Sequence, residues 1–283
     1  MSIKKVGIIG SGIMGSGIAQ LCAQSGFEVV VRSRSNATAQ DMIAGIEKSL
    51  NKLLEKGKIQ EPDRDGTISR LSGTSDLSKL SDCDLVIESV LEDLDTKKHL
   101  FIELDRVCKP DAIIATNTST LPVIEMAMAT GRPELVCGVH FFNPATVMSL
   151  VEVVRPLTAL DSTIDLVTEF ALACGKTPVA VKDQAGFIVN ALLFPYLNNA
   201  VRMLENSVAT MEDIDAAMKG GCGFPMGPFA LLDLVGLDTS LAILDALYDE
   251  FKDPNYAAVP TLRRMVAAEL LGRKSGKGFY NYG

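Results

Sequence analysis

The sequence predicts an α/β domain with a mostly parallel sheet over residues 1–183, followed by an all-α domain over residues 184–283. Two observations predict the first domain: short apolar, β-branched runs recur along it, and segments with helical spacing separate them. Strands separated by helices form a parallel sheet with helices on both faces. A third observation predicts the boundary, because the strand signal ends after Lys182 and the segment KDQAG breaks the pattern.

The individual elements follow from these patterns in chain order. The expected strands are KKVGIIG, FEVVVR, CDLVIES, AIIATN, LVCGVH, SLVEVV and TPVAVK. In the first domain, the expected helices are 16–25, 42–58, 95–107 and 162–173. In the second domain, they are 186–206, 211–218, 228–251 and 260–271, with little strand signal between them.

Composition excludes several classes of protein. The chain has 283 residues and a net charge of −8, and nucleic-acid binding needs a basic face, so we expect no nucleic-acid partner. No apolar run is long enough to span a membrane. The first strand begins almost at Met1, which leaves no room for a signal peptide, so we expect a cytoplasmic protein. The six scattered cysteines are expected to be reduced, mostly buried thiols and not metal ligands.

A glycine-rich turn follows the first strand, and its expected contacts with a dinucleotide are Gly10, Gly12, Ile13, Met14 and Gly15. Gly10 permits the tight turn, Gly12 lets backbone amides approach a pyrophosphate, and Gly15 allows close packing of helix on strand. The following helix directs its partial positive charge at the phosphates. A tight turn without a ligand is the alternative. The context of strand, turn and helix favours a Rossmann-type dinucleotide-binding domain.

The end of the next strand departs from the usual pattern. A carboxylate is expected there to bind the ribose 2′-hydroxyl of NAD, but the chain has Arg32-Ser33-Arg34. Ser33 would not repel a 2′-phosphate, and the flanking guanidinium groups are able to bind phosphate oxygens. The sequence therefore predicts a preference for NADP(H). The alternative is that both arginines are solvated charges and that NAD(H) is used.

A histidine and a glutamate lie in neighbouring apolar strands. His140 ends one apolar run, and Glu152 lies inside SLVEVV. A carboxylate in such a strand is costly unless it is paired, and a histidine is a natural partner. We therefore expect Glu152 to orient His140, which would act as a general base. A purely structural pair is the alternative, and the other histidine, His99, lies in a charged helix and is expected at the surface.

Several longer motifs resemble one family. They are GIIGSGIMGSGIAQ, CDLVIESVLEDLDTKKHLF, NTSTL, GVHFFNPATVMSLVEVV, AGFIVNALLFPYLNNA, GFPMGPFALLDLVGLD and GRKSGKGFYNY. Together they cover essentially the whole chain. On these motifs the chain resembles the 3-hydroxyacyl-CoA dehydrogenases, and within them most of all the bacterial (S)-3-hydroxybutyryl-CoA dehydrogenases.

The resemblance implies roles for individual residues. It makes His140 the catalytic base with Glu152 as its partner, and it places Ser119 and Asn190 around the reacting oxygen. Further cofactor contacts are expected from Glu92, Lys97, Asn117 and Asn143. The implied reaction interconverts acetoacetyl-CoA and (S)-3-hydroxybutyryl-CoA by hydride transfer. A dehydrogenase of a free hydroxyacid and a non-catalytic dinucleotide-binding protein are the alternatives.

Two surfaces are expected to bind partners, one an acyl-CoA substrate and the other a second copy of the chain. Lys48, Lys52 and Lys56 recur every four residues beside an apolar stripe, and this row could bind the phosphates of an acyl-CoA substrate. A solvated lysine face is the alternative. The segment 228–251 is apolar over more than one helix face, and such a surface often packs against a twin. Together with the resemblance, this predicts a homodimer through the helical domain, and packing within the chain is the alternative.

Overall fold

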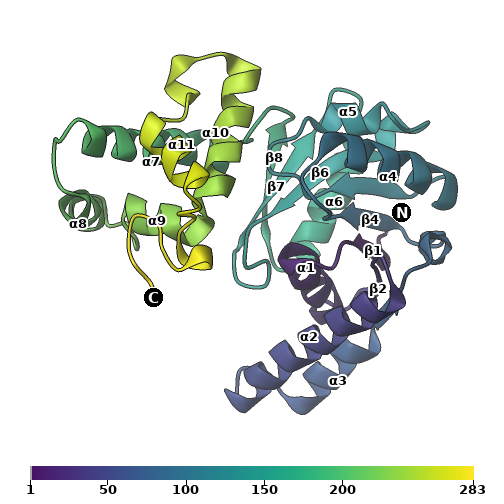
Figure 1. The fold of residues 1–283 in the computed structure, drawn as a ribbon. Helices are drawn as coiled ribbons and strands as arrows, with labels where there is room; N and C mark the ends of the chain where they lie inside the picture. The colour runs from purple at the N-terminus through teal and green to yellow at the C-terminus, as the bar shows by residue number, and fades with distance from the viewer. Residues whose placement is uncertain (1) are drawn as a thin grey trace. The chain divides into compact units, whose positions relative to one another are not determined.

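The computed structural model describes residues 2–283 and divides the chain into two compact units. The first unit ends at Asp183, and the second runs from Gln184 to Gly283. The first unit is an α/β domain and the second is helical (Figure 1). The predicted fold class, a mostly parallel sheet domain followed by an all-α domain, is therefore confirmed.

The first unit is built on one eight-stranded sheet. Its strands are β1 Lys5–Ile9, β2 Glu28–Arg32, β3 Leu71–Thr74, β4 Leu85–Glu88, β5 Ile113–Thr116, β6 Val136–Phe141, β7 Leu150–Arg155 and β8 Thr177–Lys182. They lie in the order β3-β2-β1-β4-β5-β6-β7-β8, and every neighbouring pair is parallel except β6 with β7. The chain adds strands on one side of β1 up to β3 and then on the other side from β4. The carboxyl ends of β1 and β4 therefore lie next to each other where the strand order reverses, which is the topological switch point.

Helices cover both faces of this sheet (Figure 1). They are α1 Ile13–Gln24, α2 Asn36–Glu55, α3 Glu61–Ser69, α4 Leu94–Val107, α5 Val123–Ala127 and α6 Asp161–Ala173. Helices α1, α2 and α6 share one apolar core with the strands, in which Phe27 and Phe170 have ring centroids 5.2 Å apart. Because helices cover both faces, β1, β4 and β5 are almost entirely buried, which explains their unbroken apolar sequences.

The second unit contains five α-helices among the described residues. They are α7 Val189–Glu205, α8 Met211–Cys222, α9 Pro228–Val235, α10 Leu237–Phe251 and α11 Pro260–Ala267. The single helix expected over 228–251 is wrong, because Gly236 separates α9 from α10. Gly236 has φ of +102°, a conformation that glycine adopts readily and that interrupts a right-handed helix.

Two aspartates hold the second unit together. Asp215 accepts hydrogen bonds from the backbone N–H groups of Phe229 (2.8 Å) and Ala230 (3.1 Å), and so caps α9. Asp233 accepts from the N–H groups of Phe279 (2.9 Å) and Tyr280 (2.8 Å). The C-terminal segment is therefore anchored by its backbone as well as by its aromatic side chains.

The apolar surface expected for a dimer is largely used within the chain. The residues of 228–251 that the core of the second unit buries are Phe229, Leu232, Leu237, Ile243, Leu244 and Leu247. Other apolar side chains of this unit remain exposed, among them Leu192 at 71% and Val208 at 62%.

Two further observations concern the chain as a whole. No helix of residues 2–283 has the length and apolar character needed to cross a membrane. Five of the six cysteines are buried, as expected, and Cys222 is exposed.

Candidate active site

The glycine turn after β1 is shaped by close backbone contacts. Gly10 has φ of +113°, and a Cβ at this position would lie 2.1 Å from the carbonyl oxygen of Ser89. A Cβ on Gly15 would lie 2.0 Å from the carbonyl oxygen of Gly10. A Cβ on Gly12 would meet no atom within 4 Å. Gly10 and Gly15 are therefore required by packing, whereas Gly12 faces open space.

The open space beside Gly12 lies at a helix N-terminus that suits a phosphate group. A cavity of about 400 Å³ lies there, lined by Ser11, Gly12, Ile13, Ser16, Thr38, Asp41, Met42 and Gly45. No side chain caps the N-terminus of α1, which begins at Ile13. Backbone N–H groups at an uncapped helix N-terminus favour a phosphate. The residues present thus suit the pyrophosphate of a nicotinamide dinucleotide.

Hydroxyl groups take the place of the missing acid after β2. Ser33 is 5% exposed, and its hydroxyl lies 3.0 Å from that of Ser11 and 2.6 Å from that of Thr38. Arg32 is half-buried and donates from Nε to the carbonyl oxygen of Ser75 (3.4 Å), whereas Arg34 is exposed. Ser33 is therefore engaged with protein hydroxyls, and Arg34 is the more accessible of the two guanidinium groups.

The one antiparallel pair of the sheet brings His140 and Glu152 together. The two residues are direct partners in the register of β6 and β7, so their side chains lie on the same face. His140 Nδ1 is 2.7 Å from Glu152 Oε2, and the two residues are 4% and 0% exposed. His140 Nε2 is 3.0 Å from Ser119 Oγ. The imidazole is thus held on one side by a buried carboxylate and on the other by a hydroxyl.

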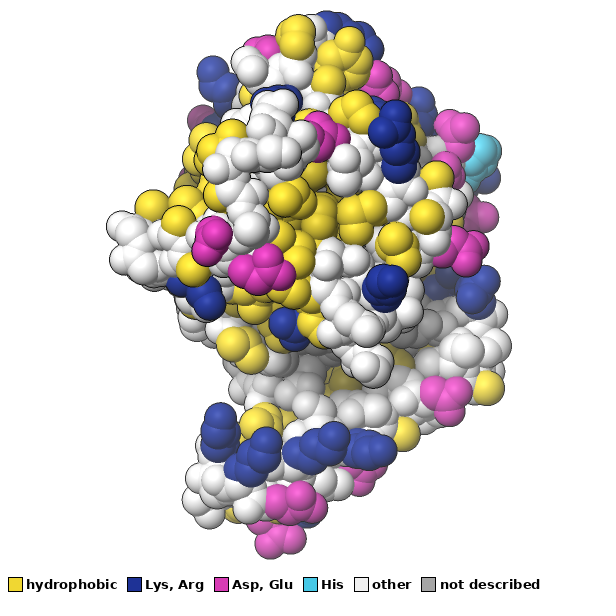
Figure 2. Space-filling model, turned by 60° about the vertical axis from the view of Figure 1, so that its left-hand side comes forward, with side chains coloured by type: hydrophobic (Ala, Val, Ile, Leu, Met, Phe, Trp, Pro, Cys, Tyr) yellow, Lys and Arg dark blue, Asp and Glu magenta, His cyan; other side chains and the backbone are white. Residues whose placement is uncertain are grey.

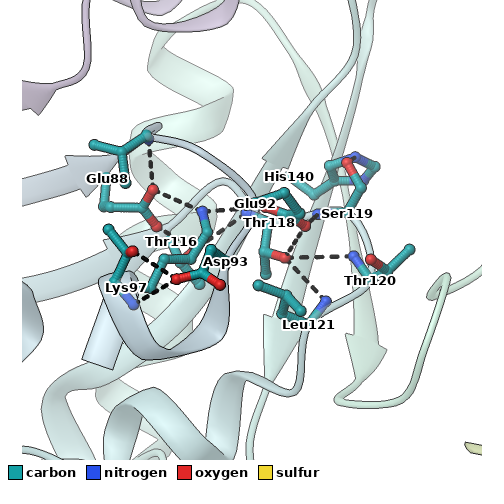
Figure 3. A network of polar contacts seen from close by, with 12 residues as sticks. Glu88, Glu92, Asp93, Lys97, Thr116, Thr118, Ser119, Thr120, Leu121 and His140 are labelled. Atoms are coloured by element: carbon teal, nitrogen blue, oxygen red, sulfur yellow. Dashed lines mark hydrogen bonds and ion pairs between the residues drawn. The ribbon is translucent and has the colours of Figure 1, made fainter. Parts of the chain in front are cut away.

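The loop that carries Ser119 is fixed by side chains from several elements. Glu92 Oε1 accepts hydrogen bonds from the Thr118 hydroxyl and from the Ser119 N–H, the latter at 3.0 Å (Figure 3). Asn117 Oδ1 accepts from the N–H of Phe141 (2.8 Å), next to His140. Together these bonds tie the loop after β5 to the end of β6.

The far end of this loop is also anchored. Asp183 accepts hydrogen bonds from the N–H groups of Val123 (2.9 Å) and Ile124 (2.7 Å), at the start of α5. Burial raises the pKa of Asp183, and these two bonds act in the opposite direction. Both ends of the segment that bears Ser119 are therefore attached to the sheet domain.

Lys97 is buried and is therefore not an ordinary surface lysine. It is 1% exposed, and its amine lies 2.6 Å from Glu88 Oε1 and 3.1 Å from Glu92 Oε2 (Figure 3). Glu88 is 0% exposed and is the last residue of β4. Sequence reasoning missed Glu88, although an acid inside the apolar run CDLVIES was the same signal that led to Glu152.

Other residues predicted for the site have no described bond to this network, and one of them belongs to the other unit. Asn143 is exposed. Asn190 is 8% exposed at the start of α7, in the second unit, and its place at the reacting oxygen stays a prediction. Lys48, Lys52 and Lys56 are exposed on and just after α2. Figure 2 shows cationic side chains in a row at the lower end of the view, where α2 and α3 lie.

A parallel sheet with a glycine turn at its switch point, and a buried histidine–glutamate pair beside the same edge, define a dinucleotide-binding oxidoreductase. The match to known families specifies the class further. Residues 5–184 match the 3-hydroxyacyl-CoA dehydrogenase NAD binding domain, and residues 186–282 match the 3-hydroxyacyl-CoA dehydrogenase C-terminal domain. The chain belongs to the 3-hydroxyacyl-CoA dehydrogenase family.

Individual relatives cover the full length. A 3-hydroxybutyryl-CoA dehydrogenase of Mycobacterium tuberculosis is 48% identical over 283 residues, which is 99% of each chain. One from Clostridioides difficile is 46% identical over 278 residues, 98% of this chain and 99% of the relative. The crystal structure of (S)-3-hydroxybutyryl-CoA dehydrogenase PaaH1 from Ralstonia eutropha has a TM-score of 0.97 at 42% identity and covers 100% of both chains.

Proposed function

We propose that this protein interconverts acetoacetyl-CoA and (S)-3-hydroxybutyryl-CoA, with a nicotinamide dinucleotide as the redox partner. The observation that carries the proposal is the line Glu152–His140–Ser119, in which both ring nitrogens of a buried histidine have defined partners. The names of the full-length relatives support the choice of substrate.

His140 is the proposed acid and base. The bound dinucleotide supplies a hydride acceptor or donor for C3 of the substrate. In the oxidation direction, His140 Nε2 removes the proton of the 3-hydroxyl group, while Glu152 holds Nδ1 and stabilises the imidazolium. In the reduction direction, the imidazolium returns the proton to the carbonyl oxygen. Ser119, and in this proposal Asn190, donate hydrogen bonds to the same oxygen and stabilise its developing charge.

Cofactor binding is assigned to the glycine turn and to the residues after β2. The N–H groups around Gly12 would bind the pyrophosphate. We propose a preference for NADP(H), because no carboxylate stands at Ser33 to repel a 2′-phosphate and Arg34 is exposed beside it. Since the Ser33 hydroxyl is already engaged, the arginines would provide most of the attraction. Use of NAD(H) is the alternative.

One assay separates the candidate functions. Purified protein is mixed with acetoacetyl-CoA or free acetoacetate, and with NADPH or NADH, and the loss of absorbance of the reduced cofactor is followed. We expect turnover of the thioester, with higher kcat/KM for NADPH. Turnover of acetoacetate alone would favour a free-hydroxyacid dehydrogenase, and no turnover at all would favour a non-catalytic protein. Higher kcat/KM for NADH would overturn the cofactor preference alone.

We also propose that the protein is a homodimer through its helical unit. The family resemblance and the exposed apolar side chains of that unit, such as Leu192 and Val208, support this. Light scattering after gel filtration should give twice the 30.3 kDa mass of one chain. A mass of one chain at micromolar concentration would contradict the proposal.

A further inference from the structure

Glu88 is a buried carboxylate that the proposed reaction does not use directly. It is 0% exposed and ends an otherwise apolar strand, a position where an ionised group is costly unless it is fully paired. Glu88 Oε1 accepts hydrogen bonds from Lys97 Nζ and from the N–H of Val90, both at 2.6 Å. Glu88 Oε2 accepts from the Thr116 hydroxyl at 2.7 Å.

Two routes lead from Glu88 to the backbone N–H groups of Thr118 and Ser119 (Figure 3). In the first, Lys97 binds Glu88 and Glu92 at once, and Glu92 accepts from the Ser119 N–H. In the second, Thr116 donates to Glu88 and its Oγ1 accepts from the N–H of Thr118 at 3.1 Å. Because the two routes end at consecutive peptides on the N-terminal side of Ser119, both bear on the position of Ser119.

Charge explains why a carboxylate is needed at this position. Lys97 is 1% exposed, and if Glu88 were neutral its only described counter-ion would be the more exposed Glu92. Its remaining partner, Glu92, would then be drawn toward the ammonium group. Glu92 uses its other oxygen to hold Thr118 and Ser119, so this shift would loosen the loop beside His140.

We propose that Glu88 is a positioning residue, which acts through Lys97, Glu92 and Thr116 to hold Ser119 Oγ against His140 Nε2. This role rests on the proposed dehydrogenase function. It differs from simple stabilisation of the fold, because it predicts a change at His140, which the described bonds connect to Glu88 only through intervening residues.

The opposite end of β4 provides a matched control. Asp84, just before the first residue of the strand, also binds a lysine, Lys109, and accepts hydrogen bonds from the N–H groups of Lys4 (2.7 Å) and Lys5 (2.9 Å). Asp84→Asn removes one charge from a similar pair on the same strand. Among the described residues, the bonds of Asp84 lead to Lys109 and to the backbone at Lys4 and Lys5 and not to Ser119, so this variant serves as the control for a loss of stability.

The test compares Glu88→Gln, Asp84→Asn and the unaltered protein in steady-state kinetics. We expect Glu88→Gln to lower kcat by a factor of about 10 to 100, as misplacement of a catalytic group does. The KM for acetoacetyl-CoA should change by less than about threefold, because a positioning defect acts mainly on the chemical step. Asp84→Asn should keep the kcat of the unaltered protein. A kcat for Glu88→Gln within about twofold of the unaltered protein would overturn the proposal.

A spectroscopic measurement tests the same idea without turnover. The chain has two histidines, so the imidazole ¹⁵N resonances are assigned with one further variant, His99→Gln. We expect the Nε2 resonance of His140 to move in Glu88→Gln and not in Asp84→Asn, because its contact with Ser119 changes. Unchanged resonances would refute the positioning role. If the unaltered protein does not reduce acetoacetyl-CoA, the proposed function fails, and this measurement still decides the role of Glu88.

A second variant covers the case in which Glu88→Gln does not fold. Thr116→Val is nearly isosteric, keeps Glu88, Lys97 and Glu92 charged, and removes only the second route. We expect a smaller loss of kcat, about three- to tenfold, and the same movement of the His140 resonance. Unaltered kcat and an unaltered resonance in this folded variant would also overturn the proposal.

Discussion

Strand β4 has a carboxylate at each end, and each carboxylate binds a lysine. At the amino end, the side chains of Asp84 and Lys109 are 16% and 29% exposed. At the carboxyl end, those of Glu88 and Lys97 are 0% and 1% exposed. The bonds of Asp84 lead to the backbone of β1, whereas those of Glu88 lead to Ser119. The two lysine–carboxylate pairs are therefore similar in chemistry and different in role. The fully buried pair lies at the carboxyl end of β4, and ligands bind at the carboxyl ends of the strands of a parallel sheet.

Among the predicted effects on turnover, the loss of the His140 side chain should be the largest. We expect His140→Ala to lower kcat by a factor of about 100 to 10,000, the usual contribution of general acid–base catalysis. Thermal unfolding should remain cooperative. His99→Gln is the control, because His99 is exposed and its Nδ1 contacts only the carbonyl oxygen of Asp95 among the bonds described here. Near-normal turnover in His140→Ala would end the proposed mechanism.

An acid at Ser33 should change cofactor choice without changing the chemistry. Ser33→Asp restores a carboxylate at the end of β2, which repels a 2′-phosphate and binds a 2′-hydroxyl. We expect the ratio of kcat/KM for NADPH to that for NADH to fall at least about tenfold. Ser33→Ala is the control, since it removes the hydroxyl and adds no charge. An unchanged ratio in Ser33→Asp would show that the residue after β2 does not distinguish a 2′-phosphate from a 2′-hydroxyl.

At the amino end of β4, substitution should affect stability and not turnover. Burial acts to raise the pKa of Asp84, but hydrogen bonds from Lys109 and from the backbone N–H groups of Lys5 and Lys4 outweigh it, so the pKa is lowered from 3.8. We expect Asp84→Asn to reduce the free energy of unfolding by about 1–2 kcal/mol at pH 7, the low end for charged hydrogen bonds because the pair is partly exposed.

The pH dependence of this effect follows from the direction of the pKa shift. A carboxyl group with a lowered pKa in the folded state contributes stability above its unfolded pKa, and that contribution is lost as pH falls through the folded value. The difference in stability between the two proteins should therefore be full above about pH 5 and shrink below about pH 4. Urea unfolding at pH 7 and pH 3.5 measures this, and a constant difference would contradict it.

The smallest expected effect concerns a surface far from either end of β4. Replacement of Lys48, Lys52 and Lys56 by alanine should raise the KM for acetoacetyl-CoA by about two- to fivefold and leave kcat nearly unchanged. Exposed charges contribute little individually, and added salt should reduce the difference. Lys79→Ala, at another exposed lysine, is the control. An unaltered KM in the triple variant would restrict substrate contacts to other parts of the chain.

Sequence patterns predicted the layers of the fold because strands buried on both faces have continuous apolar runs. They missed β3, whose sequence LSGT has no such run. They also joined α9 to α10, since Gly236 lies within an apolar pattern of helical spacing. The strand β3 is instead defined by its pairing with β2, which is a tertiary feature.

Sequence patterns predicted the part of the site that follows from a single rule about buried acids. An acid in an apolar strand needs a partner, and this rule led from Glu152 to His140. Glu88 follows the same rule, but its partner Lys97 lies nine residues along the chain in a charged helix. Helical spacing in a charged segment does not reveal which lysine is buried. The role of Asn190 stays a prediction, as does the cofactor preference.

The antiparallel pairing of β6 and β7 has a consequence for how this chain tolerates change. The acid–base pair is a cross-strand pair of two strands joined by the eight residues 142–149, so its two members lie on one hairpin. A residue inserted within either strand would shift the register and turn one partner toward the opposite side of the sheet. A residue inserted in the connection between them would leave the pair opposed. The length of the exposed stretch 146–149 of this connection is thus a variable that natural drift or protein engineering can alter while the proton-transfer geometry is retained.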